Sequence, residues 1–236
     1  MNLSFAEDRI LAVVAHPDDA ELLCAGTLAR AKEDGADISI CVCCNGDKGH
    51  SSRPVENLAE VRQQEMAAAA DVLGANLYLL NIPDGELADN TANRRSLIEI
   101  VRRCKTTHLL AHASTDYHPD HQAASKLAEA ASWFSASRGH KTESPALHSP
   151  PALWWMDTVN MLGFEPGLFI DVSDYASVKE DMLACHRSQL ARSNDGDFSS
   201  LLELMRLQYR TRGMQSGVEA AEAFRIHPAF KRVRAA

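Results

Sequence analysis

Residues 9–23, RILAVVAHPDDAELL, decide the fold. Residues 9–15 form a short apolar run that is typical of a buried strand, and residues 19–34 continue as a helix that Gly35 would cap in the left-handed conformation. A turn that contains His16 and two aspartates joins the strand to the helix. This order of strand, turn and helix predicts one βα unit of a parallel sheet.

The same alternation of apolar runs and longer helical stretches continues through the chain. We expect strands at residues 37–44, 77–80 and 107–112, further apolar segments at 152–156 and 167–172, and helices at 55–73, 93–104, 119–135, 173–191 and 198–215. Residues 137–151 are rich in Ser, Pro, Gly and His without periodicity, which predicts a long loop. The pattern predicts one α/β domain over residues 1–236, a Rossmann-like three-layer sandwich around a mostly parallel central sheet.

The composition is that of an ordinary globular protein with an acidic balance. Hydrophobic residues make up 45% of the chain, and 24 Lys and Arg against 32 Asp and Glu give a net charge of −8. Disordered, collagen-like and coiled-coil chains have other compositions. A nucleic-acid partner is not expected, because phosphate binding requires clustered cations. The one basic cluster is interpreted as a solvated tail and consists of Arg225, Lys231, Arg232 and Arg234.

The chain has no segment that we expect to enter a membrane or the secretory pathway. Its apolar runs are far shorter than the roughly 20 residues of a membrane helix, and residues 1–7 lack the pattern of a secretory signal. We therefore expect a cytoplasmic protein. Six cysteines are too few for a disulfide scaffold. Cys41, Cys43 and Cys44 share one apolar segment, which favours reduced core residues over metal ligands.

Two turns rich in His and Asp follow two of the predicted strands. The first contains His16, Asp18 and Asp19, and the second contains His118, Asp120 and His121. In an open α/β sheet the ligand site lies at the carboxyl ends of the strands, so two parallel strands would bring both turns to one edge. Alone, Asp19 would be interpreted as a helix cap and a single histidine as a hydrogen-bonded side chain. The two clusters together favour a metal site.

These side-chain types suit hydrolytic chemistry. Two histidines and a carboxylate leave one position of a tetrahedral zinc open, and bound zinc lowers the pKa of its water to about 7. Asp18 is one residue from a proposed ligand and can act as a base on that water. A histidine near the metal stays cationic only where a carboxylate such as Asp120 compensates it. The residues therefore supply the groups that amide hydrolysis needs.

The chain resembles the PIG-L or LmbE-like deacetylases over most of its length. The anchors of the resemblance are residues 16–21 (HPDDAE) and 118–121 (HPDH), in the family's order. Supporting matches are Gly26-Thr27-Leu28, Asn45-Gly46-Asp47, Arg62, Glu65, Pro83-Asp84-Gly85, Asp171-Val172-Ser173, Lys179, His186-Arg187-Ser188-Gln189 and Ala221-Glu222-Ala223-Phe224-Arg225. The family includes deacetylases of N-acetylglucosaminyl-phosphatidylinositol and of mycothiol and bacillithiol synthesis, so the resemblance implies a metal-dependent N-deacetylase.

The resemblance also implies which residues hold the metal and which act on the substrate. His16, Asp19 and His121 would hold the metal, expected to be Zn²⁺ with Fe²⁺ or Co²⁺ as alternatives. Asp18 would be the general base.

His118 would face the substrate carbonyl as its imidazolium, and Asp120 would orient and charge-stabilise it. Some members of the family have a tyrosine two residues before this histidine, where the present chain has Asp116. The adjacent Tyr117 is expected to point elsewhere. The resemblance therefore gives no tyrosine a role in oxyanion binding.

Four further residues are candidates for substrate binding: Asp47, Arg62, Asp84 and His186. Each has an alternative interpretation. Arg62 would form a surface pair with Glu65 one helical turn away. The two aspartates would stabilise turns, and the histidine would stabilise a helix end.

The sequence thus predicts a hydrolase that removes the acetyl group from an N-acetylated amino sugar, of the N-acetylglucosamine type, or from its conjugate. Alternatives are a hydrolase of another amide, such as an acylated antibiotic or a chitin-derived oligosaccharide, and a non-catalytic sugar-binding relative. A dinucleotide-binding protein is not expected, because the first turn lacks Gly-x-Gly-x-x-Gly. By family analogy the chain would form a homo-oligomer, a trimer or hexamer.

Overall fold

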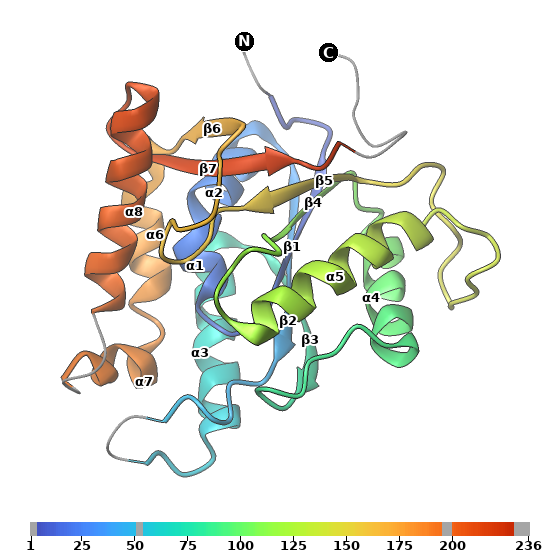
Figure 1. Cartoon of the computed structure of the whole chain (residues 1–236), viewed down its shortest axis with the longest axis horizontal. Helices are drawn as coiled ribbons and strands as arrows, with labels where there is room; N and C mark the ends of the chain where they lie inside the picture. Colours follow the sequence, from blue (N-terminus) through green and yellow to red (C-terminus); the bar gives the residue numbers. More distant parts are fainter. Residues whose placement is uncertain (1–3, 51–53, 195–199, 229–236) are drawn as a thin grey trace.

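The computed structural model describes residues 4–50, 54–194 and 200–228. They form a seven-stranded sheet between two layers of helices (Figure 1). The strands are β1 (Arg9–Val14), β2 (Asp37–Cys44), β3 (Asn76–Ile82), β4 (His108–His112), β5 (Ala152–Met156), β6 (Leu168–Asp171) and β7 (Ala221–Ile226). Their order is β3-β2-β1-β4-β5-β7-β6. Strands β1 to β5 pair in parallel, whereas β7 is antiparallel to β5 and β6.

Helices cover both faces of the sheet and confirm the three-layer prediction (Figure 1). One face carries α4 (Thr91–Arg103) and α5 (Pro119–Phe134). The other carries α1 (Asp19–Leu23), α2 (Ala25–Asp34), α3 (Leu58–Leu73), α6 (Ala176–Leu183) and α8 (Leu201–Ser216). Shorter connecting pieces are α7 (Arg187–Leu190) and the 3₁₀ turns Ser173–Tyr175 and Ala191–Asn194. Residues 137–151 contain neither helix nor strand, as expected.

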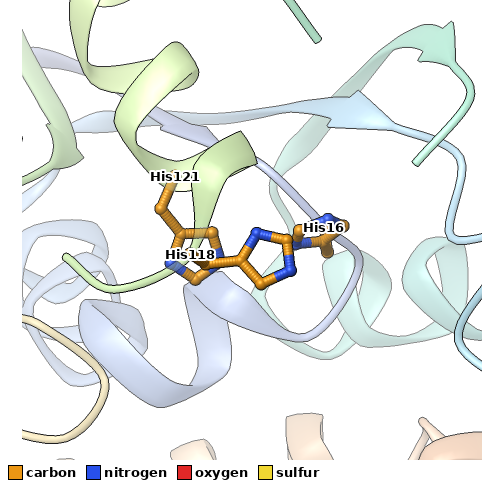
Figure 2. Close-up of side chains that lie close together, drawn as sticks. All are labelled: His16, His118 and His121. Carbon is orange, nitrogen blue, oxygen red and sulfur yellow. The ribbon is translucent and has the colours of Figure 1, made fainter. Parts of the chain in front are cut away.

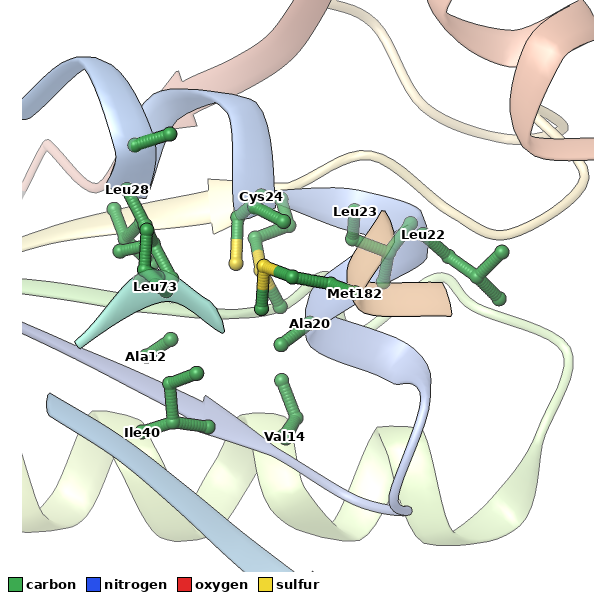
Figure 3. Close-up of a cluster of buried hydrophobic side chains, with 14 of the residues drawn as sticks. Ala12, Val14, Ala20, Leu22, Leu23, Cys24, Leu28, Ile40, Leu73 and Met182 are labelled. Atoms are coloured by element: carbon green, nitrogen blue, oxygen red, sulfur yellow. The ribbon is translucent and has the colours of Figure 1, made fainter. Parts of the chain in front are cut away.

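Strand β1 is buried on both faces because its side chains alternate between two hydrophobic clusters. Ile10, Ala12 and Val14 belong to one cluster, and Leu11 and Val13 to the other. In Figure 3, side chains of α1, α2 and α6 lie over β1 and β2 in the first cluster. The strand is therefore held from both sides, and so is the start of the turn that follows it.

The single helix expected at residues 19–34 is two helices in the structure. Helix α1 ends and α2 begins at Cys24, whose φ of −149° interrupts the helical path. A break of this kind leaves carbonyls at the end of the first helix and N–H groups at the start of the second without helical partners. Both sets of groups find partners in one buried ion pair, which the sequence pattern does not reveal.

This ion pair joins Lys179 of α6 to Glu222 of β7, and both side chains are buried. Lys179 Nζ donates to the carbonyl of Glu21 at 2.8 Å, at the end of α1. The Glu222 carboxylate accepts from the N–H groups of Gly26 (2.9 Å) and Thr27 (2.7 Å) at the start of α2. The last strand of the sheet therefore fixes the helix break behind the first turn.

Replacing Lys179 with methionine should lower the free energy of unfolding by about 3–5 kcal/mol, because it leaves the Glu222 carboxylate buried without its cation. Urea or guanidinium unfolding measures the change. Lys126→Met is the control, since that lysine is exposed and its loss should change stability by less than about 0.5 kcal/mol. Equal effects of the two substitutions would contradict a stabilising role for the pair.

The C-terminal third departs from the sequence prediction in two further places. No strand is predicted at Ala221–Ile226, yet this segment is β7 and lies between β5 and β6. The helix expected at residues 173–191 is divided into a 3₁₀ turn and two short α-helices. Both departures arise where charged or polar side chains are buried through contacts with distant segments, which hydrophobic periodicity does not encode.

Several smaller expectations can be compared with the structure. All six cysteines are free, as expected for reduced core residues. Among the residues that the structure describes, no helix has the length and apolar character needed to cross a membrane. Arg225 of the basic cluster lies in β7, whereas Lys231, Arg232 and Arg234 lie outside the described residues.

Candidate metal and catalytic site

The two His/Asp-rich turns meet at the carboxyl edge of the sheet because β1 and β4 are parallel neighbours. Val13 pairs with Ala111 in the shared register, so the turns after the two strands begin side by side. Helix α1 follows the first turn and α5 follows the second. The meeting of the two clusters, predicted from the sequence, is present in the structure.

The first turn positions two adjacent aspartates in different directions. Asp18 precedes α1 with a φ of 104°, in the left-handed region that aspartate tolerates better than most residues. Its carboxylate lies 3.1 Å from Arg62 Nη2. Asp19 is buried, and its Oδ2 accepts from the His16 N–H at 2.7 Å. Asp19 therefore points back toward the histidine, and Asp18 toward the arginine.

The second turn carries a histidine that caps α5. His118 Nδ1 accepts a hydrogen bond from the backbone N–H of Asp120 at 3.1 Å. The N–H of His118 donates to Asp116 Oδ1, also at 3.1 Å. Because Nδ1 of His118 serves as the helix cap, Nε2 is the ring nitrogen left to face a substrate.

Three histidine rings converge where the turns meet (Figure 2). The ring centroids of His16 and His118 are 4.7 Å apart, those of His118 and His121 are 4.9 Å apart, and those of His16 and His121 are 5.4 Å apart. One nitrogen from each ring lies within 4.8 Å of the others. This spacing allows a group of ring nitrogens to bind a single metal ion.

Asp19 supplies the carboxylate of the site. Its Oδ1 lies 3.3 Å from His121 Nε2, and its Oδ2 lies 3.5 Å from His16 Nδ1. The two contacts use different oxygens of Asp19, so its carboxylate lies between the two rings. Two imidazole nitrogens and a carboxylate oxygen are a suitable donor set for zinc.

The far nitrogens of both histidines are held by buried carboxylates. His16 Nε2 lies 3.1 Å from Asp120 Oδ2, and His121 Nδ1 lies 3.1 Å from Asp116 Oδ1. Metal-binding histidines usually have such a carboxylate behind them, because it fixes the ring and its tautomer. The donor chemistry of His16, Asp19 and His121 therefore suits a metal. Two overlapping groups have donor atoms within 4.8 Å of one another: His16 with His118 and His121, and Asp19 with His112 and His121.

His112, at the end of β4, is a competing ligand that the sequence did not single out. Its Nε2 lies 3.3 Å from Asp19 Oδ2, and its ring stacks on that of His121 at 4.0 Å. The same Nε2, however, accepts a hydrogen bond from the Ala15 N–H at 3.0 Å. With this lone pair already in use, His112 fits a neutral positioning role better than a ligand role.

The electrostatics of the site favour positive charge between the carboxylates. Burial lowers the pKa of His121, but the facing Asp19 and Asp116 carboxylates outweigh it and raise this pKa to about 9. Burial and the neighbouring His121 cation lower the pKa of His112 to about 4. Burial opposes ionisation of Asp19, yet the His121 cation holds its pKa well below the ordinary value.

The proposed base and electrophile have shifted pKa values as well. Burial raises the pKa of Asp18, with the neighbouring Arg62 cation acting in the opposite direction. Burial and the charges of His16 and His121 lower the pKa of His118. Its Nδ1 also accepts a hydrogen bond and so carries no proton, so the structure shows a neutral ring where the resemblance implies an imidazolium.

Asp120 differs from the role expected for it. The sequence assigns its carboxylate to His118, but Asp120 Oδ2 lies against His16 and accepts from the Gly85 N–H at 2.8 Å. Asp120 contacts His118 through its backbone N–H instead. At the helix start the His118 ring caps α5 by accepting this N–H, while the Asp120 side chain reaches across to the first turn.

Arg62 is part of the site and not of a surface pair. Its side chain is 3% exposed and donates to the carbonyls of Pro17 and Gly46 as well as to Asp18. A Cβ at Gly46, whose φ is +76°, would lie 2.6 Å from the Arg62 side chain. Glu65, the alternative partner, binds Ser188 instead.

Asp47 and Asp84 tie two loops together. Asp84 Oδ1 accepts from the Gly46 N–H at 2.8 Å, and Asp47 Oδ1 accepts from the Asp84 N–H at 2.9 Å. The turn-stabilising interpretation therefore describes both residues. Asp84 also lines the cleft over the site, whereas Asp47 is not among its lining residues.

His186 lies behind the site. It is fully buried, and its Nε2 is 3.2 Å from Glu21 Oε1, itself fully buried. Its pKa is raised because Glu21 and Asp18 outweigh the effect of burial. His186 does not line the cleft, but Gln189, one turn further along, does.

A cleft of about 590 Å³ opens over the converging turns. Its walls include residues that the sequence did not indicate, among them Lys48, Tyr117 and Arg192. Tyr117 is 63% exposed, and its ring lies 6.0 Å from that of His118, so it faces the cleft and does not point elsewhere. A cleft of this volume accommodates a small ligand.

Known proteins with similar sequences and structures include deacetylases and a hydratase. The chain is 26% identical to the diacetylchitobiose deacetylase of Thermococcus kodakarensis over 231 residues, covering 93% of this chain and 83% of that relative. The structure resembles N,N'-diacetylchitobiose deacetylase from Pyrococcus horikoshii with a TM-score of 0.82 at 24% identity, covering 95% and 85% of the two chains.

The 4-carboxy-2-hydroxymuconate hydratase of Pseudomonas putida shares the fold at a TM-score of 0.79 and 22% identity, with 96% of this chain and 99% of that chain covered. The fold alone therefore does not decide between hydrolysis and hydration. Residues 11–132, just over half of the chain, match the PIG-L family, described as GlcNAc-PI de-N-acetylase. This match includes both turns of the site, and the chain belongs to the PIG-L family.

Proposed function

We propose that this protein is a metal-dependent N-deacetylase of a small N-acetylated amino sugar, of the N-acetylglucosamine type, or of its conjugate. The observation that carries the proposal is that His16 and His121 both lie against the Asp19 carboxylate, with Asp18 next to it in the chain and all four residues lining one cleft. Membership of a de-N-acetylase family supports the reaction class.

His16, Asp19 and His121 would hold the metal, and zinc is the proposed ion. When bound, it supplies a Lewis acid and a water of lowered pKa. Two nitrogens and one carboxylate oxygen are a typical catalytic zinc set. Asp120 and Asp116 would fix the two rings from behind.

Asp18 would accept the proton of the attacking water. Arg62 Nη2 lies 3.1 Å from its carboxylate and would orient it. The raised pKa that burial gives this carboxyl makes it a stronger base than an exposed aspartate.

His118 would face the carbonyl oxygen of the scissile amide. Its Nδ1 is fixed by the Asp120 N–H, so the ring can present only Nε2 to the cleft. Arg62 and Asp84 line the same cleft and would contact sugar hydroxyls. Asp47 and His186 would act indirectly, through the loop that Asp47 holds and the helix that His186 packs against.

Acetate release tests the function. The protein is incubated with N-acetylglucosamine, diacetylchitobiose and an N-acetylglucosaminyl-inositol conjugate, and free acetate is measured. An unsaturated hydroxydicarboxylic acid is the comparison substrate for hydration. We expect acetate from at least one N-acetyl sugar. Hydration of the acid without acetate release from any sugar would overturn the proposal.

The purified protein should contain about one divalent metal per chain, because one set of two histidines and one aspartate fits it. Elemental analysis after mild dialysis measures the content. Removal by a chelator should abolish acetate release, and added zinc should restore it. Full activity of the metal-free protein would contradict the ligand assignment.

His118→Ala should lower turnover by about 10²–10³, the range for loss of a group that stabilises an oxyanion, and should leave the metal content unchanged. Turnover and elemental analysis are measured on the same preparation. Metal loss in this variant would instead show that His118 is a ligand. His140→Ala is a suitable control, because that histidine is exposed in the 137–151 loop.

A further inference from the structure

Cys44 lies directly beneath the proposed metal site. It is the last residue of β2, is 2% exposed, and its N–H donates to the Ala15 carbonyl at 2.7 Å, which ties it to the residue before His16. Its Sγ, a His16 ring nitrogen and an Asp120 carboxylate oxygen all lie within 4.8 Å of one another. The proposed deacetylation uses no thiol, so this group has a role still to be assigned.

We propose that Cys44, His16 and Asp120 form a second cation site, selective for thiophilic divalent ions such as Cd²⁺ and excess Zn²⁺, whose occupation inhibits the enzyme. The cation site itself rests on this geometry alone; only the inhibition rests on the proposed function.

The donor set and its spacing fit such an ion. Zinc bonds of about 2.0–2.3 Å to nitrogen, oxygen and sulfur place neighbouring donors roughly 3.3–3.8 Å apart in a tetrahedron. His16 Nε2 and Asp120 Oδ2 are already 3.1 Å apart, so a small opening of this pair would admit the ion. A thiolate ligand favours Zn²⁺ and Cd²⁺ over Mg²⁺ and Ca²⁺. His16 and Asp120 line the cleft, so an ion that enters it reaches two of the three donors directly.

The second site shares His16 with the first. His16 directs Nδ1 toward Asp19 and Nε2 toward Asp120, so the two cations would lie on opposite nitrogens of one ring. Binding of the second ion forms a bond to the Cys44 sulfur and a bond to His16 Nε2. It releases the thiol proton and the ring proton, two in all, to solvent.

The second ion would inhibit the enzyme because it binds two groups, Asp120 and His16, that the proposed reaction also needs. Asp120 would exchange its contact with His16 for a bond to the ion, and the shared ring would become a different ligand for the first metal. Asp120 also fixes His118 through its N–H. A shift of this residue therefore disturbs the ligand and the electrophile together.

The test is a titration of Cd²⁺ into protein that already holds one equivalent of zinc. The wild type should bind one further ion, show thiolate-to-cadmium charge-transfer absorption in the ultraviolet, release about two protons per ion, and lose acetate-releasing activity. In Cys44→Ser the absorption should disappear and binding should weaken at least about 10–100-fold, the range seen for perturbed metal sites, while activity without cadmium is retained.

Cys104→Ser is the matched control, because that cysteine is half-buried beyond the end of α4 and should leave the titration unchanged. Cys44→Ala repeats the experiment if the serine variant does not fold. No absorption in the wild type at saturating cadmium, or undiminished absorption in Cys44→Ser, would overturn the proposal. These readouts do not depend on activity, so a failure of the deacetylase assignment would be seen separately.

Discussion

Asp18→Asn should lower turnover by about 10²–10⁴, the range for loss of a general base, with metal content close to that of the wild type. Asparagine keeps the size of the side chain and tolerates the left-handed φ of 104°. It removes only the proton acceptor beside Arg62. Acetate release and elemental analysis on one preparation measure both quantities.

The amide of this variant still accepts a hydrogen bond from Arg62, which is also held by the carbonyls of Pro17 and Gly46. The arginine should therefore stay in place, and a loss of activity would report on the base. Two results would contradict the assignment. Metal loss would show that Asp18 also coordinates, and full activity would require another base, with Asp120 the next candidate.

Asp19→Ala should have the largest effect of all, because it removes the only carboxylate among the three proposed ligands. We expect both metal content and turnover to fall, with turnover limited to the residual metal-loaded fraction. The substitution also removes the acceptor of the His16 N–H, so the turn itself is disturbed. Metal content, turnover and thermal unfolding are measured together.

Asp19→Asn separates these two effects. Its amide oxygen can still accept the His16 N–H and hold the turn, but it is a weaker, uncharged donor to the metal. We expect the asparagine variant to unfold near the wild-type temperature and yet to bind zinc poorly. Normal metal content in both variants would exclude Asp19 as a ligand and direct attention to His112, whose Nε2 lies 3.3 Å from it.

The sequence predicts the parts of the fold that depend on local pattern. The strand at residues 37–44 and the start of the helix at Pro119 agree with the structure. The meeting of the two turns is also predictable, because it needs only that two strands be parallel neighbours. Strand β7 is not predictable in this way, since its buried Glu222 finds its partners in distant segments: Lys179, 43 residues away, and the N–H groups of Gly26 and Thr27.

The site shows the same division. The proposed metal ligands and catalytic residues lie in two short motifs and can be identified from the sequence, whereas Lys48 and Arg192 of the cleft wall cannot. The supporting groups His112, at the end of β4, and His186, which lies against Glu21, come from outside these motifs. The contact of Asp120 with His16 could not be foreseen, because it joins side chains 104 residues apart whose orientation no local pattern encodes.

The ion pair of Lys179 and Glu222 has a consequence for folding during synthesis, because it lies far along the chain from the ligands that it helps to position. All three proposed ligands lie within the first 121 residues, but the helix break behind the first turn is fixed by residues 179 and 222. During translation the three ligand residues leave the ribosome well before Lys179 and Glu222 do. The nascent chain therefore carries an unfinished site until its last strand pairs, and a fragment cut after the second turn would contain every ligand without the frame that aligns them.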